Sequence, residues 1–194
     1  YNEFKRNLPD FFRNIWWPDM LKVASRTNIL YTGALIETYN DNVNPPFNNP
    51  GDDEFNSLVS YGRELIQSNG EIGLHGYNHQ SLTTDGEISK FFGYNVWQSI
   101  EDMKAALTEL HGYMQQAFPA YEATSYVPPS NVLSEEGRIA LKEALPHLVV
   151  IASLYNEDST NRGYIQEFDV GEDQIINMPR VSSGYYRNDT NEWD

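Results

Sequence analysis

The chain has 194 residues, of which 40% are hydrophobic, and it carries a net charge of −15. This length suffices for one well-filled core, so we expect a single domain over residues 1–194, as part of a longer protein. The acidity excludes nucleic acid as a partner, because few cations are present to displace phosphate counterions, and no apolar run approaches the ~18 residues of a membrane span.

The first half of the chain alternates helical and strand patterns. Pro18 stands in the first turn of an amphipathic segment, where proline is favoured. A run rich in β-branched and aliphatic residues follows and is typical of a strand buried on both faces. The predicted elements are a helix at 18–28, a strand at 29–38, a loop at 40–53, a helix at 53–70 that stops at Gly70, and a strand at 71–74.

The second half repeats this alternation. Apolar residues three and four apart predict one long helix, and Ser134 followed by two acids is typical of a helix start. The predicted elements are a helix at 95–118, a strand at 123–128, a helix at 134–145, and strands at 147–153 and 174–181. Helices that alternate with buried strands predict an α/β fold with a mainly parallel sheet.

Functional groups in parallel α/β folds gather at the carboxyl ends of the strands. Two histidines, His75 and His79, follow the predicted strand at 71–74. Other polar or aromatic side chains at such ends are Glu37, Asp41, the segment 126–131 and Arg180.

The histidine pair is the candidate metal site. The chain has no cysteine, so a metal ion must be bound by His, Asp or Glu. If residues 75–79 form a helical turn, the two side chains share one face and can converge on zinc. Gly76 stands where the H-E-x-x-H metalloproteases carry their general base, which excludes that class. A structural, hydrogen-bonding pair stays open as the alternative.

The segment "EIGLHGYNHQSL" resembles the second motif of the NodB-like polysaccharide deacetylases, carbohydrate esterase family 4. That motif reads His, Ser or Thr, two variable residues, then His, and it lies after a strand; here Gly76 replaces the Ser or Thr. The resemblance extends over about residues 16 to 181 and points to a divergent bacterial branch. It implies a distorted (β/α) barrel of about seven mainly parallel strands.

The resemblance also implies ligands for a divalent metal ion, most often zinc. His75 and His79 are by this likeness two of the ligands, and an aspartate is the third. The family's first motif, Thr-Phe-Asp-Asp, supplies that ligand and the catalytic base, but no Asp-Asp pair precedes Trp16. We therefore expect the general base on a strand upstream of Tyr1, so that the chain lacks the first strand of its barrel.

Two further motifs depart from the family pattern. The third motif, Arg-x-Pro-aromatic, corresponds to residues 126–130, and its last residue gives a backbone N–H to the oxyanion. Pro129 has no N–H to give, whereas Ser130 keeps one, so we favour the register that ends at Ser130. The family's last motif contains a leucine and a histidine that acts as the general acid. In this chain Met178 and Arg180 stand at those positions instead. Arg180 stays protonated and could hold an oxyanion or a sugar carboxylate.

The resemblance thus implies a metal-dependent hydrolase that removes acetyl groups from a polysaccharide or glycan, outside the cytoplasm. Polar and aromatic side chains near the strand ends are expected to contact the sugar. These are Tyr77, Tyr126, Asn131 and Tyr185.

Two other functions fit the same residues. The first is a non-catalytic carbohydrate-binding relative that has lost its acid and base, which explains the altered third and last motifs equally well. The second is another metal-dependent glycan hydrolase on the same barrel, with Glu37 and Asp41 as extra carboxylates.

Overall fold

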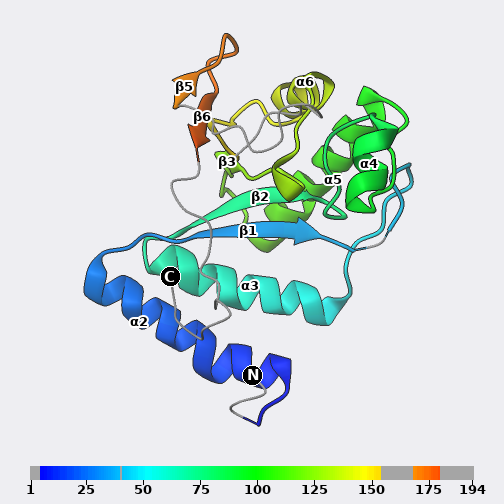
Figure 1. Ribbon diagram of the computed structural model, residues 1–194. Coiled ribbons are helices and arrows are strands. Elements are labelled where there is room, and N and C mark those ends of the chain that lie inside the picture. Colours follow the sequence, from blue (N-terminus) through cyan, green and yellow to red (C-terminus); the bar gives the residue numbers. More distant parts are fainter. Residues whose placement is uncertain (1–4, 40, 154–167, 180–194) are drawn as a thin grey trace, which may run out of the picture.

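A six-stranded, mainly parallel sheet runs through the protein in the order β1-β2-β3-β4-β6-β5 (Figure 1). The structure is a computed structural model that describes residues 5–39, 41–153 and 168–179. Only β5 runs antiparallel to its neighbour, so the predicted mainly parallel sheet is confirmed. The strands are β1 Thr32–Glu37, β2 Glu71–Tyr77, β3 Ser125–Tyr126, β4 Val150–Ser153, β5 Asp169–Val170 and β6 Ile176–Pro179.

All four predicted helices are present. The helix predicted from 95 begins later, because Ser99 is the N-cap and accepts a hydrogen bond from the Asp102 N–H. The predicted cap Ser134 likewise accepts from Gly137 N–H. The helices are α1 Leu8–Phe11, the π-helix η1 Phe12–Trp16, α2 Trp17–Thr27, α3 Asp52–Gln67, α4 Gly86–Phe92, α5 Ile100–Ala117, the 3-10 turn η2 Pro129–Asn131 and α6 Glu135–Ala144.

The strands of the described residues form an open sheet, with β1 at one edge and β5 at the other. The α/β class is therefore confirmed, whereas closure into a barrel of about seven strands stays a prediction. Within the described ranges, no helix combines the length and apolar character needed to cross a membrane.

The helices pack in layers beside the sheet (Figure 1). Helix α3 lies along β1 and β2, and α2 lies on the outer side of α3. Trp17 joins these two helices, since its indole N–H donates to Glu64 Oε2 at 2.8 Å. Helix α5 contributes Leu107, Leu110 and Met114 to the core, all 0% exposed. Ile72 and Leu74 of β2 belong to this same core, which holds in place the strand that carries His75.

A β-bulge near the end of β2 determines which side chains leave the core. Leu35 pairs with Leu74 and Glu37 pairs with Tyr77, so that two residues of β2 oppose the single residue Ile36. The extra residue reverses the alternation of side chains. By ordinary alternation His75 faces away from the fully buried Leu74, and the extra residue leaves Tyr77 buried in the core, at 1% exposed.

Candidate functional site

His75 and His79 lie side by side at the carboxyl end of β2. Their ring centroids are 4.9 Å apart with an interplanar angle of 69°. The predicted helical turn over 75–79 is wrong, because His75 belongs to the strand. A left-handed turn brings the second ring back to the first, with φ of 55° at Asn78 and 52° at His79. The pair is thus formed by the bulge and the turn.

A backbone carbonyl fixes the His75 ring. His75 Nδ1 lies 2.6 Å from the carbonyl oxygen of Val127, the residue that follows β3. A carbonyl can only accept a hydrogen bond, so Nδ1 carries the proton and donates it. Nε2 then carries the lone pair, and this is how metal-binding histidines are oriented by a carbonyl.

The His79 ring lies between aromatic rings. Tyr39 stacks on it with centroids 5.3 Å apart and an interplanar angle of 16°, and Tyr94 meets it edge-on at 6.0 Å. Burial first, and then the charge of His75, lower the pKa of His79. The neutral imidazole, which is the form that binds a metal ion, is therefore favoured.

Buried amides hold the turn between the two histidines. Asn78 is 0% exposed, and its side chain accepts from the Asp41 N–H at 2.7 Å and donates to the Asp41 carbonyl. Gln80 Oε1 accepts from the Asn95 N–H at 2.8 Å. The loops that follow β1 and α4 are thereby fastened to the histidine turn.

The two acids at the end of β1 have separate roles. Partial burial opposes ionisation of Asp41, but hydrogen bonds from the Tyr77 hydroxyl at 2.7 Å and the Asn48 amide at 2.9 Å hold its pKa below the usual value. Glu37 is 0% exposed; burial, followed by the charges of Glu109 and Asp41, raises its pKa to about 8. These contacts give Asp41 a structural role. They do not support the alternative of another glycan hydrolase that uses Glu37 and Asp41 as extra carboxylates.

The described residues supply only part of a metal site. Across 5–39, 41–153 and 168–179, no three His, Cys, Asp or Glu side chains are grouped to hold an ion. His75 and His79 offer two imidazoles side by side, and within these ranges no third His, Cys, Asp or Glu side chain is grouped with them. The aspartate expected upstream of Tyr1 stays a prediction.

Two of the expected sugar contacts are wrong. Tyr77 is 1% exposed because the bulge turns it into the core, and Tyr126 is 0% exposed under Gly76. Neither ring can stack on a sugar. Asn131 is half-buried in η2 with a φ of 59°, and its contact with substrate stays a prediction. The remaining predicted residues, Tyr185 and Arg180, lie outside the described residues.

Ser130 lies near the histidine pair. Its hydroxyl shares a hydrogen bond with that of Tyr94, whose ring contacts His79. Ser130 has a φ of 51°, and the next N–H, that of Asn131, donates to the Pro128 carbonyl at 3.0 Å. The structure thus brings Ser130 to the site, while the part played by its own N–H stays a prediction.

Sequence reasoning missed the rings that contact His79. Tyr39 comes just after Thr38, the residue that follows β1, and Tyr94 ends the run "FFGY", where Gly93 stops α4 with a φ of 74°. Their positions, one just after a predicted strand and one just after a glycine that ends an aromatic run, were the signals that could have indicated them.

Several solved structures are similar to this chain. The chain is similar to a candidate polysaccharide deacetylase from Mycobacterium smegmatis, with a TM-score of 0.52 and 16% identity over 84% of this chain and 45% of that one. A CE4 family pseudoenzyme from Bacillus anthracis has a TM-score of 0.46 and 12% identity over 70% of this chain and 37% of that one. A mutant of it with restored enzymatic activity has a TM-score of 0.45 and 12% identity over 70% and 39%.

The chain spans less than half the length of each of these structures. At such low identity, the similarity to the Mycobacterium smegmatis protein shows a shared deacetylase-like fold only. Among curated proteins, none matches the sequence. One family model matches residues 1–194, and its description is "Uncharacterised protein conserved in bacteria (DUF2194)". Because this match covers the whole chain, the protein belongs to the DUF2194 family.

Proposed function

We propose that the chain is part of a metal-dependent hydrolase that removes acetyl groups from a glycan outside the cytoplasm. One observation carries the proposal: His75 and His79 lie side by side at the carboxyl end of β2, and the Val127 carbonyl orients the first ring. The deacetylase-like fold supports it, since this edge of a parallel sheet is where such folds place their chemistry.

The donor set suits zinc. Neutral imidazoles are among the preferred ligands of this ion, and the Val127 bond leaves the His75 Nε2 lone pair for it. A bound divalent ion would polarise the acetyl carbonyl and lower the pKa of water to about 7. The third ligand and the general base would be aspartates outside the described residues.

The chain's other residues would bind and orient the acetyl group. In the register that we favour, the Ser130 N–H stabilises the oxyanion. Loss of one such donor typically raises the activation free energy by about 2.7–4 kcal/mol. Arg180 would hold the same developing negative charge, because arginine stays protonated. Asn131 and Tyr185 would contact the sugar.

A non-catalytic glycan-binding relative is the second candidate. It is favoured by the segment after β3, where Pro128 and Pro129 supply no N–H and the Asn131 and Val132 N–H groups donate to their carbonyls. Such a protein would keep the histidine pair and the sugar contacts but would not accelerate acetyl hydrolysis.

Acetate release from acetylated oligosaccharides by the full-length protein tests the proposal. We expect release in the presence of zinc, its loss with a chelator, and a fall of at least about 100-fold in His75→Ala and His79→Ala. His111→Ala is the matched control, since His111 lies in α5 and contacts Glu122 at 3.3 Å.

Release that survives both the chelator and the two substitutions would contradict the metal-dependent mechanism. Binding of the oligosaccharide without any acetate release would favour the non-catalytic candidate instead.

A further inference from the structure

A polar cavity of about 480 Å³ opens between the loop after β1 and the loop after α4. This volume falls within the ~300–1,000 Å³ that is usual for small-ligand sites. Four residues with amide side chains and one acid are the polar residues that line it: Asn42, Asn44, Asn95, Gln98 and Asp41.

The cavity is next to the histidine pair. Tyr39, which stacks on His79, leads into the first loop, and Tyr94, which meets His79 edge-on, precedes Asn95 in the second. Asn78, from the histidine turn, bonds the backbone of Asp41. In Figure 1 the loop after β1 rises beside α4.

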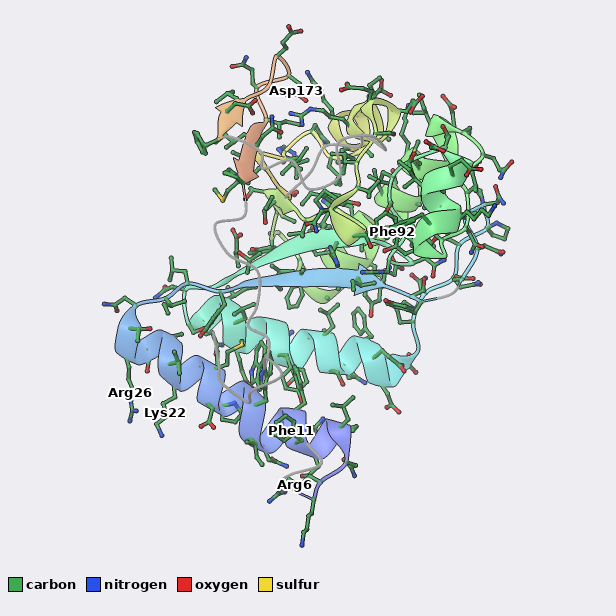
Figure 2. The ribbon with its side chains drawn as sticks, in the orientation of Figure 1. Arg6, Phe11, Lys22, Arg26, Phe92 and Asp173 are labelled. Atoms are coloured by element: carbon green, nitrogen blue, oxygen red, sulfur yellow. The ribbon has the colours of Figure 1, made fainter. Side chains whose placement is uncertain are left out.

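Exposed aromatic faces extend this wall. Tyr39 is 64% exposed, and Phe92 stacks on Tyr94 with centroids 5.9 Å apart and an interplanar angle of 21°. Figure 2 places Phe92 beside the sheet, at the far side of the molecule from Lys22 and Arg26 on α2. A sugar ring can lie its apolar face on such rings while its hydroxyls reach polar groups.

The lining chemistry selects among sugars. Side-chain amides both donate and accept hydrogen bonds, which matches neighbouring hydroxyls on a sugar ring. Asp41 is the one charged residue among those that line the cavity, and the chain carries −15 overall. A uronate or phosphorylated sugar would be repelled by this surface.

We propose that this cavity is a binding subsite for an uncharged sugar unit of a glycan chain, next to the unit presented to His75 and His79. The role as a neighbouring subsite rests on the proposed function. The binding itself does not, because none of the lining residues belongs to the histidine pair.

Calorimetric titration of the full-length protein in excess chelator tests the subsite. The probes are neutral hexasaccharides, with and without N-acetyl groups, and an oligogalacturonate of equal length. We expect the neutral sugars to bind and the oligogalacturonate not to bind. Tyr39→Ala and Asn95→Ala should each raise Kd about tenfold, as expected for one lost sugar contact.

Phe168→Ala and Gln67→Ala are the matched controls. Phe168 is 63% exposed, close to the 64% of Tyr39, and Gln67 is an exposed amide at the end of α3. Equal effects of the control and the subsite variants would overturn the proposal, as would tighter binding of the oligogalacturonate or no binding of any neutral sugar. The chelator separates this result from the proposed function, whose failure would appear as absent zinc binding or acetate release.

Discussion

Glu37→Gln is expected to stabilise the protein above about pH 5, with a gain that grows until about pH 8. Glu37 is 0% exposed, and burial raises its pKa to about 8 from 4.5. The nearby charges of Glu109 and Asp41 act in the same direction. The folded protein therefore keeps this carboxyl protonated at neutral pH.

The free energy of unfolding depends on pH because the folded and unfolded states bind the Glu37 proton differently. Below about pH 4.5 both folded and unfolded states hold the proton, so Glu37 costs nothing. Between that pH and 8, only the folded state holds it, and its contribution to stability falls by about 1.4 kcal/mol per pH unit. The cost reaches up to about 3 kcal/mol at pH 7, and glutamine does not incur it.

Urea unfolding between pH 4 and pH 8.5 measures this difference. Glu87→Gln is the control, because Glu87 is exposed in the first turn of α4 and is solvated in both states. A constant offset between wild type and Glu37→Gln over the whole range would show that Glu37 titrates normally, and the buried neutral carboxyl would then be rejected.

Gly76→Ala is expected to destabilise the fold by about 1–3 kcal/mol and to weaken zinc binding. Gly76 has a φ of 86°, a conformation that side chains with a Cβ rarely adopt. A Cβ there would also lie 3.0 Å from Pro129 Cγ and 3.3 Å from the Tyr126 hydroxyl. Relieving these contacts would move the bulge that carries His75. A serine, found at this place in the deacetylase motif that the segment resembles, would meet the same strain.

Gly112→Ala is the matched control for thermal unfolding. Gly112 lies within α5, and a Cβ built on it meets no atom within 4 Å apart from its chain neighbours and the backbone of its own helix. Alanine in a helix interior is about 1 kcal/mol more favourable than glycine, so this variant should be stabilised. If the two variants shifted the melting temperature in the same direction, the strained bulge at Gly76 would be refuted.

The regular elements were predictable because their signals are local. The helix at 95–118 and the helix at 134–145 were found from apolar spacing and from Ser134, and the strand at 29–38 from its continuous apolar run. Ends were less accurate: the helix predicted to reach Gly70 stops at Gln67, and Asn69 takes the left-handed turn with a φ of 62°. Short α4, with Asp85 as its cap, has too few residues for a clear period.

The site was predicted in part. The position of His75 and His79 after a strand was enough to place them together, but the reason given, a helical turn, was wrong. A bulge depends on how β2 pairs with β1, and one sequence carries no direct record of that pairing. For the same reason Tyr77 was expected near the substrate, although the extra residue turns it into the core.

The subsite loops were beyond local prediction as well. The cavity brings Asp41 and Asn95 together from loops separated by the whole of α3, β2 and α4. Asn78 and Gln80 fasten these loops through side-chain bonds to backbone groups. Such long-range bonds leave no periodic pattern in the sequence, so the polar residues of 40–53 read only as a loop.

Zinc titration of the full-length protein tests the central claim most directly, namely that His75 and His79 hold a divalent ion. Calorimetry should show one zinc site in the wild type, an affinity reduced at least about 100-fold in His75→Ala and in His79→Ala, and no change in His111→Ala. Equal zinc affinity in all four proteins would contradict the claim and leave the pair a structural one.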